Sequence, residues 1–179
     1  MVAEQYTLRI HRKHFKRKEI AMTEEQKCEI LFILDSWNHT PFVPSLHGKA
    51  KKLRFADCVS FPIAVYTELG IIKGEMKLPE YNSKFCGSYA FEQLIDGIRS
   101  LGAQEVWAKK PLIKFSDYVP KLEVGDLIVC SIGAGCHHLC IYSGDDQVFD
   151  CYPPRGVAER SVNFKLIHKT AKYVFRFTN

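Results

Sequence analysis

A cysteine and a histidine of this chain are placed where they could form a nucleophile and its base. Cys58 is the second residue of DCVSFPIAVYTELG, a stretch with helical spacing that ends at Gly70. A thiol reacts as the thiolate, and a helix N-terminus stabilises that anion through its unpaired N–H groups and its dipole. His138 opens an apolar run, HLCIYS, that is typical of a strand. If that strand packs against the helix, the imidazole can take the thiol proton.

A third polar residue is available to orient the histidine. Asp150 follows His138 by twelve residues, and the Gly144-Asp145 pair between them indicates a turn. A hairpin turned there places Asp150 on the neighbouring strand, where its carboxylate can fix the tautomer of the imidazole. Each residue also has a structural interpretation: Cys58 as a small apolar core residue, His138 as a polar strand edge, and Asp150 as an acceptor for a turn amide.

The first half of the chain predicts helices that position the thiol. TEEQKCEILFILDSW predicts a helix with Thr23 as N-cap and a capping box closed by Gln26. Its predicted buried face consists of Ile30, Leu31, Leu34 and Trp37. SYAFEQLIDGIRSLG predicts a later helix that is capped by Ser88 and ended by Gly102.

The second half of the chain predicts a sheet. From Val124 onward, short apolar runs are separated by turn residues: LIVCSI, HLCIYS, QVFDCY, GVAERSV and KYVFRF. Helices followed by strands predict an α+β fold, in which the N-terminal helices, including the nucleophile helix, pack on a C-terminal antiparallel β-sheet. Because a chain of 179 residues normally builds one core, we expect a single domain over residues 23–179.

Composition excludes several classes of protein. The sequence is 46% hydrophobic and 25% charged, which is too apolar for a disordered chain. No apolar run approaches the roughly 18 residues of a membrane span, so we expect no membrane partner. The first residues lack the apolar core of a signal peptide, so we expect synthesis in the cytoplasm and a place of action in a virion or phage tail or on the cell envelope. Seven cysteines, an odd number, indicate reduced thiols.

Two further features could bind a partner. Cys136 and Cys140 flank two histidines, but no second close cysteine pair completes a tetrahedral zinc site, so we expect no metal and no other cofactor. Six basic residues between Arg9 and Lys18 lie in a predicted basic N-terminal arm or hairpin over residues 1–22. Such a block can bind nucleic acid or anionic envelope polymers. Without a recognisable nucleic-acid fold downstream, a solvated arm is the simpler interpretation, and we do not expect nucleic acid as a partner.

Four segments in order resemble the NlpC-type cysteine peptidases of bacterial cell walls, a papain-like family with phage-tail relatives. SWNHTPF is similar to the family's tryptophan–x–x–Thr–Pro–Tyr segment, and ADCVSFPIAVYTELGI is similar to its Asp–Cys helix. VGDLIVC is similar to its Gly–Asp–Leu strand, and HHLCIYSGDDQVFD to its His–Val–Gly–Ile–Tyr hairpin. The resemblance covers most of the chain, implies a papain-like fold and is strongest to the phage-tail branch.

The resemblance implies roles for individual residues. Cys58 would be the nucleophile and His138 the base, with Asp150 as the third polar residue, where relatives more often have His, Asn or Gln. A Cys58–His138 ion pair would give a bell-shaped pH profile. Backbone N–H groups at the helix start would stabilise the oxyanion.

Four neighbouring residues are assigned to substrate binding. The resemblance implies that Asp57 holds the free amine of the substrate peptide, and Ser60 and His137 adjoin the two reactive residues. Phe42 stands where many cell-wall relatives have a tyrosine hydroxyl, and Val59-Ser60 replaces the common Ser-Gly. These departures predict an altered substrate pocket.

By resemblance, the substrate is a peptidoglycan stem peptide that is cut between a D-glutamyl residue and a diamino acid. Phage-tail proteins are further expected partners, through the basic arm. Two alternatives stay open. One is a non-catalytic module that binds envelope polymer or assembles into a phage tail, and the other is a papain-like deamidase, amidase or acyltransferase with a different substrate.

Overall fold

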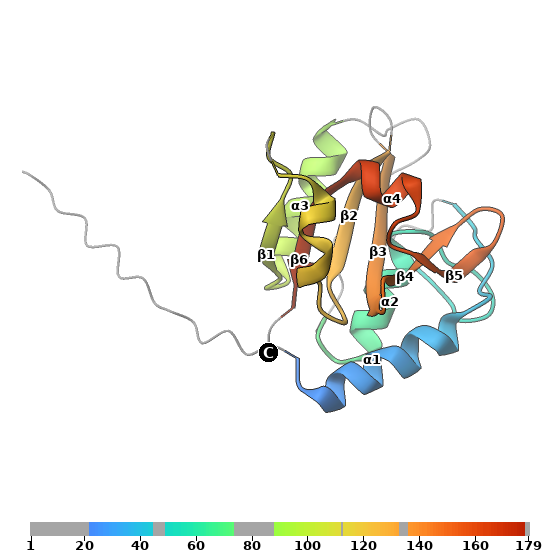
Figure 1. Ribbon diagram of the computed structural model, residues 1–179. Helices are drawn as coiled ribbons and strands as arrows, with labels where there is room; N and C mark the ends of the chain where they lie inside the picture. The colour runs from blue at the N-terminus through green and yellow to red at the C-terminus, as the bar shows by residue number, and fades with distance from the viewer. Residues whose placement is uncertain (1–21, 45–48, 74–87, 112, 133–135, 178–179) are drawn as a thin grey trace, which may run out of the picture.

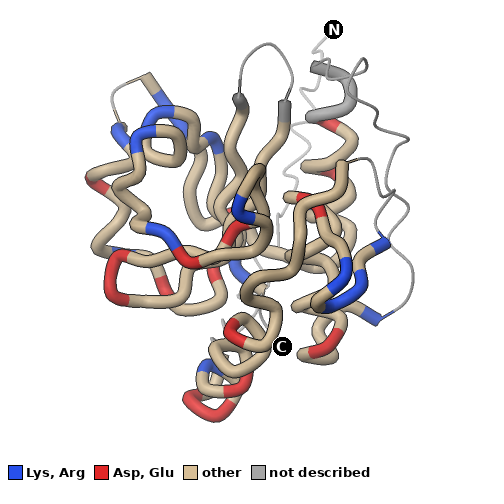
Figure 2. Tube along the Cα trace, turned by 90° about the vertical axis from the view of Figure 1, so that its right-hand side faces the viewer, with Lys and Arg blue, Asp and Glu red and all other residues tan. Residues whose placement is uncertain are grey.

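The computed structural model describes residues 22–44, 49–73, 88–111, 113–132 and 136–177, without the side chains of residues 88–91, 132 and 136. The predicted basic arm lies outside the described residues, apart from Met22. Along the described chain, acidic and basic residues are interspersed (Figure 2). None of the helices within these ranges has the length and apolarity that a membrane crossing needs.

A six-stranded antiparallel sheet forms the centre of the molecule (Figure 1), with the strand order β1-β6-β2-β3-β4-β5. The strands are β1 (Gln104–Ala108), β2 (Leu127–Ile132), β3 (Cys136–Gly144), β4 (Gln147–Tyr152), β5 (Gly156–Ser161) and β6 (Ala171–Arg176). The five apolar runs of the sequence correspond to β2 to β6. The edge strand β1 was not predicted, because only Trp107 of its five residues is buried and the run lacks an apolar alternation.

Helices cover the sheet on both sides. They are α1 (Glu24–Trp37), α2 (Ser60–Glu68), α3 (Ser88–Ser100) and α4 (Lys165–Thr170), with two 3-10 turns at Phe115–Asp117 and Val119–Lys121. The first three helices were predicted. Helix α4 has six residues and one buried side chain, Ile167, which is too short a pattern to show helical periodicity. The predicted α+β class with helices on a C-terminal antiparallel sheet is confirmed.

The two faces of the sheet bury different clusters, because side chains along a strand alternate between faces. The cluster that packs against α1, α2 and α3 includes the strand residues Leu127, Val129, Leu139, Ile141, Phe149 and Cys151. The opposite cluster packs under α4 and the 3-10 turns and includes Ile128, Cys130, Cys140, Tyr142, Val148 and Val174. This alternation decides on which face of the sheet each polar side chain of β3 and β4 lies.

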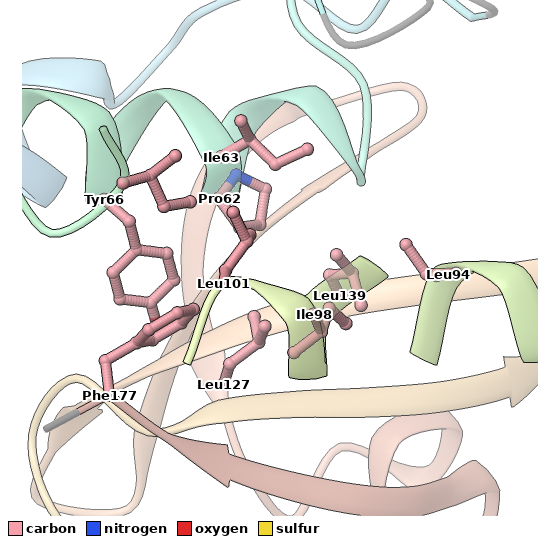
Figure 3. A pocket seen from close by; sticks show the side chains of 10 residues that line it. Pro62, Ile63, Tyr66, Leu94, Ile98, Leu101, Leu127, Leu139 and Phe177 are labelled. Atoms are coloured by element: carbon pink, nitrogen blue, oxygen red, sulfur yellow. The ribbon is translucent and has the colours of Figure 1, made fainter. Parts of the chain in front are cut away.

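Helices α2 and α3 lie over the first of these faces (Figure 3). The Tyr66 ring of α2 lies 4.5 Å from the Phe177 ring, and Tyr66 donates a hydrogen bond to the carbonyl oxygen of Gly125 at 2.9 Å. Burial raises the pKa of the Tyr66 hydroxyl well above its usual value. A buried, hydrogen-bonded tyrosine therefore fastens α2 to the turn before β2, which fixes the helix that carries the thiol.

Helix α1 begins as predicted, with Thr23 and Gln26 forming both hydrogen bonds of a capping box. Its buried face is Ile30, Ile33, Leu34 and Trp37. The prediction of Leu31 on this face was wrong, since its side chain is 37% exposed. Residues at spacings of three, four and seven share a helix face, so Ile33 takes the place given to Leu31.

The Thr40 segment after α1 lies directly against the start of β5. Val157 donates to the Thr40 carbonyl at 2.8 Å, and His39 donates to the Val157 carbonyl at 2.9 Å. Gly156 has a φ of +71°, and a Cβ added there would lie 2.1 Å from the Thr40 carbonyl oxygen. The close approach of the two chain segments therefore requires glycine at this position.

We predict that Gly156→Ala lowers the free energy of unfolding by about 2–4 kcal/mol, since left-handed strain and a backbone clash act together. Gly102→Ala is the matched control, because Gly102 has a φ of +87° but no atom within 4 Å of an added Cβ. That variant should lose only the strain energy, about 1–2 kcal/mol. Urea denaturation of both variants measures the difference, and equal losses would show that the Thr40 segment moves aside freely.

Candidate active site

The candidate nucleophile lies in the capped turn that leads into α2, two residues before the helix begins at Ser60. Asp57 Oδ1 accepts hydrogen bonds from the N–H groups of Val59 at 3.0 Å and Ser60 at 2.7 Å. In return, Ser60 Oγ accepts from the N–H of Asp57 at 2.9 Å, and the Asp57 carbonyl accepts from the N–H of Phe61 at 3.1 Å. These reciprocal bonds form a capping box around Cys58. Cys58 therefore lies at a helix start, as the sequence predicts.

Two of the residues assigned to substrate binding form this cap. Asp57 is 2% exposed and Ser60 is fully buried. Their described hydrogen bonds satisfy N–H groups of the helix start. The capping role explains the two residue types without a ligand, and contact of Asp57 with a substrate amine stays a prediction.

Phe42 lies beside the chain that leads to the thiol. It pairs with Ala56 in an isolated parallel bridge and packs partly buried against the core on the α2 side. Val43 donates to the Ala56 carbonyl at 2.8 Å, and Ala56 donates to the Pro41 carbonyl at 2.9 Å. The Thr-Pro-Phe segment thus supports the backbone two residues before Cys58.

The Cys58 thiol lies at the start of β3. Its Sγ donates to the carbonyl oxygen of His137 at 3.3 Å, so the thiol touches the peptide unit that joins His137 to His138. Among the contacts of the described residues, none joins Cys58 Sγ to the His138 imidazole. Cys58 packs against the hydrophobic cluster that contains Leu139, on one face of the sheet. The side chain of His138 lies on the other face, with that of Cys140, because side chains alternate along a strand.

His138 and Asp150 are brought together as the hairpin prediction requires. His138 Nε2 and Asp150 Oδ2 are 2.9 Å apart, and both residues are 1% exposed. The turn between the strands consists of Asp145 and Asp146, with φ values of 47° and 57°, as in a two-residue hairpin loop. Because Asp150 accepts from Nε2–H, Nδ1 is the nitrogen of His138 that is left to accept a proton.

The sequence did not reveal that Asp150 has a second partner. Arg160 Nε, from β5, donates to Asp150 Oδ1, so the carboxylate bridges an imidazole and a guanidinium. The Tyr152 ring lies edge-on to the His138 ring, with 5.5 Å between centroids. One signal could have found Arg160: it falls two residues after Ala158, which is in register with Asp150, and diagonal neighbours across strands are within reach of long side chains.

The pKa of the Cys58 thiol is raised, which is opposite to the lowering expected at a helix N-terminus. Burial is the largest cause, followed by the negative charge of Asp57. The Asp57 carboxylate occupies the helix N–H groups that would otherwise stabilise a thiolate. Burial also lowers the pKa of His137, which favours its neutral form. Burial and the Asp57 charge thus both favour the neutral thiol of Cys58 over the thiolate in the free protein.

This raised pKa predicts how alkylation depends on pH. Because only the thiolate reacts, iodoacetamide labelling of Cys58 should accelerate about tenfold per pH unit from pH 6 to 9, without a plateau. An ion pair would instead give fast labelling that is level at mildly acidic pH. Peptide mass spectrometry measures the rate, and Cys28, which is exposed on α1, serves as the accessible reference thiol. A level rate at Cys58 below pH 7 would contradict the assignment of a protonated thiol.

A cluster on the second face could in principle hold a metal ion. His138, Cys140 and Asp150 offer ligand atoms within 4.8 Å of one another. Asp150 is already bonded to His138 and to the Arg160 cation, and a second cation beside Arg160 would be repelled. The bonds to His138 and Arg160 account for the buried Asp150 carboxylate. The five described cysteines are free thiols; Cys86 and the side chain of Cys136 lie outside the described part of the chain.

Comparison of the sequence with protein-family models and with curated proteins gives no match. Solved structures do match. An NLP/P60 family protein of Staphylococcus aureus described as similar to lipoprotein has a TM-score of 0.58 at 15% identity, over 91% of this chain. An NlpC/P60 family protein from Bacillus cereus has a TM-score of 0.54 at 16% identity over 86% of the chain. NlpC2 from Trichomonas vaginalis has a TM-score of 0.54 at 12% identity over 93%.

The chain has the NlpC/P60 fold. The sequence resemblance to NlpC-type peptidases is thus confirmed at the level of the papain-like architecture. The chain spans 45%, 40% and 52% of the three matched proteins, respectively. At these identities the likeness concerns the NlpC/P60 fold, while the chemistry has to be argued from the site. The narrower relation to phage-tail proteins stays a prediction from the sequence.

Proposed function

We propose that the protein is a papain-like cysteine hydrolase that cleaves an amide bond in the peptide stems of bacterial cell walls. The observation that carries the proposal is the position of the Cys58 thiol. It lies at a capped helix start and donates to the carbonyl of His137, the residue before His138. Asp150 is hydrogen-bonded to the His138 imidazole. The NlpC/P60 fold supports the reaction class. The sequence resemblance supplies the substrate, a D-glutamyl–diamino acid bond.

In the proposed reaction, Cys58 Sγ attacks the scissile carbonyl while His138 Nδ1 takes the thiol proton. Asp150 stabilises the imidazolium that forms. The proton then passes to the leaving amine, and water hydrolyses the acyl-enzyme. Because Sγ is bonded to the His137 carbonyl in the free protein, the thiol has to leave that carbonyl and reach the imidazole, a movement that substrate binding would drive.

The oxyanion would be held by a single backbone donor of the helix start. The N–H groups of Val59 and Ser60 are taken by Asp57, which leaves the N–H of Cys58 as the donor for this role. The Cys58 amide is adjacent to the nucleophile, where the tetrahedral oxygen forms. One such donor contributes about 2.7–4 kcal/mol to the transition state in comparable enzymes.

Two histidines are candidates for the base, and paired variants separate them. His137 precedes His138 on β3. Its side chain is on the same face of the sheet as that of Leu139, the face that packs against α2. His138→Ala is expected to reduce cleavage by about 10²–10⁴-fold, the usual contribution of a general base. His137→Ala should retain most of the turnover at saturating peptide, since a substrate-binding residue affects KM and not the proton transfer. The reverse order would assign the base to His137 and overturn the role of His138.

The test of the function is the product of the reaction. The full chain would be incubated with synthetic stem peptides that contain a γ-D-glutamyl bond to diaminopimelic acid or lysine, and the products analysed by mass spectrometry. A new glutamyl carboxylate and a free diamino acid amine would support the peptidase. Loss of ammonia from an amidated stem, or transfer to an added amine, would identify a deamidase or acyltransferase instead.

A non-catalytic module is the second candidate, favoured by the bond between the Cys58 thiol and a backbone carbonyl and by the raised thiol pKa. In that case a fluorescent stem peptide would bind and remain intact. Placement in a phage tail or at the cell envelope, and binding of anionic polymer to residues 1–22, are proposals from the sequence alone. Deletion of residues 1–21, followed by sedimentation with cell walls, tests the second of these.

A further inference from the structure

A pocket of about 570 Å³ is lined by the turn between β4 and β5 and extends along β5 to the residues after it. Its walls include two aromatic rings, Tyr152 and Phe164, and three charged side chains, Arg155, Glu159 and Arg160. Glu159 accepts a hydrogen bond from the Ser143 hydroxyl at 3.1 Å, so one of its carboxylate oxygens already has a partner. The two arginines make the pocket suited to an anionic group.

The guanidinium of Arg160 is fixed in this pocket but is only partly satisfied. The side chain is 12% exposed, and its Cζ lies 5.9 Å from the ring centroids of both Tyr152 and Phe164. Of its five N–H donors, the Nε–H is bonded to Asp150, while Nη2 is buried without a hydrogen-bond partner among the described residues. A buried donor without a partner is costly, so the site favours a ligand that supplies an acceptor.

The same two residues connect the pocket to the candidate base. Arg160 shares the Asp150 carboxylate with His138, and the Tyr152 ring touches the edge of the His138 ring. A group bound beside Arg160 is therefore separated from the imidazole by one side chain.

We propose that this pocket is a subsite for a carboxylate of the peptide substrate, which the free N–H groups of Arg160 bind. The inference rests on the proposed hydrolase function and adds the residue that positions the substrate. Arginine and carboxylate match in bidentate geometry, and such charge-assisted bonds are among the strongest hydrogen bonds in proteins. The ligand class is a short peptide with a free carboxylate near the scissile amide.

The test compares two ligands on the full-length Cys58→Ala protein, which binds without cutting. The first probe is the tripeptide L-alanyl-γ-D-glutamyl-L-lysine with free carboxylates, and the second is the same peptide with every carboxylate amidated. Isothermal titration calorimetry should give a Kd at least about tenfold lower for the acid, which corresponds to one charge-assisted pairing. Equal affinity for acid and amide, or binding of neither, would overturn the subsite.

Two variants locate the effect. Arg160→Gln in the Cys58→Ala background should raise the Kd of the acid to that of the amide and leave the amide unchanged. Arg160→Lys keeps the charge beside Asp150 and should give an intermediate Kd, which covers the case in which the glutamine variant does not fold. Preference for the acid that persists in both variants would exclude Arg160. Cleavage by the wild type is measured separately. If acid and amide are cut alike, the subsite proposal is wrong and the hydrolase proposal stands. If the acid is bound selectively but not cut, the hydrolase proposal is wrong and the subsite stands.

Discussion

Replacement of Cys58 by alanine is expected to lower the rate of stem-peptide cleavage by about 10⁴–10⁶-fold, as loss of the nucleophile does in other covalent hydrolases. The thiol supplies the bond to the acyl group, and no other described cysteine lies at the helix start: Cys130, Cys140 and Cys151 are buried within the sheet. Product formation measured by mass spectrometry at saturating peptide checks the expected loss.

Cys28→Ala is the matched control for this variant, because Cys28 is an exposed thiol on α1. It should retain wild-type activity. Both variants should unfold at the same urea concentration as the parent, since the Cys58 side chain is small and half-buried. If Cys58→Ala cuts as fast as the Cys28 variant, the protein is not a thiol hydrolase of the proposed kind.

The second large effect is expected at Asp150, whose carboxylate lies fully buried between His138 and Arg160. Asp150→Ala should lower the free energy of unfolding by about 3–5 kcal/mol, because it leaves the Arg160 cation without its buried partner. The same variant should lose activity, since the tautomer of His138 is no longer fixed. Urea denaturation and peptide cleavage, measured on the same preparation, report the two effects.

A double-mutant cycle separates the ion pair from simple packing. Asp150→Asn combined with Arg160→Gln removes both charges, and the pair should recover part of the stability that Asp150→Asn alone loses. Asp96→Asn is the surface control, because its ion pair with Arg99 on α3 is exposed and should be worth at most about 1 kcal/mol. If the buried and exposed aspartates cost the same, the carboxylate does not hold a buried charge network.

The sequence pattern was sufficient for the elements with strong periodicity. The Thr23–Gln26 capping box, the helix after Asp57 and the hairpin that pairs His138 with Asp150 all follow from local spacing, because the interactions concerned span few residues. Strand β1 and helix α4 were not predicted, since tertiary packing and not a local sequence pattern stabilises such short segments.

The parts of the site that the sequence did not predict depend on contacts across the sheet. Arg160 was not connected with Asp150, because its reach depends on the register of β5 against β4. The Cys58 thiol was expected to face His138, but its hydrogen bond goes to the His137 carbonyl. A sequence shows which face a strand residue occupies only relative to its neighbours, and the position of a helix over that face is settled by the whole core.

The raised pKa of Cys58 also bears on oxidative damage. Peroxide attacks the thiolate to give a sulfenic acid, which further oxidant converts irreversibly to sulfinic and sulfonic acids. A thiol that burial and the Asp57 charge keep protonated enters this sequence slowly. Cys151, whose Sγ lies 3.4 Å from the carbonyl of Ala56, is buried nearby and has a pKa raised to about 12. We therefore expect Cys58 and Cys151 of the free protein to resist peroxide, and Cys58 to become vulnerable only when a bound peptide brings its thiol to His138, which takes the proton.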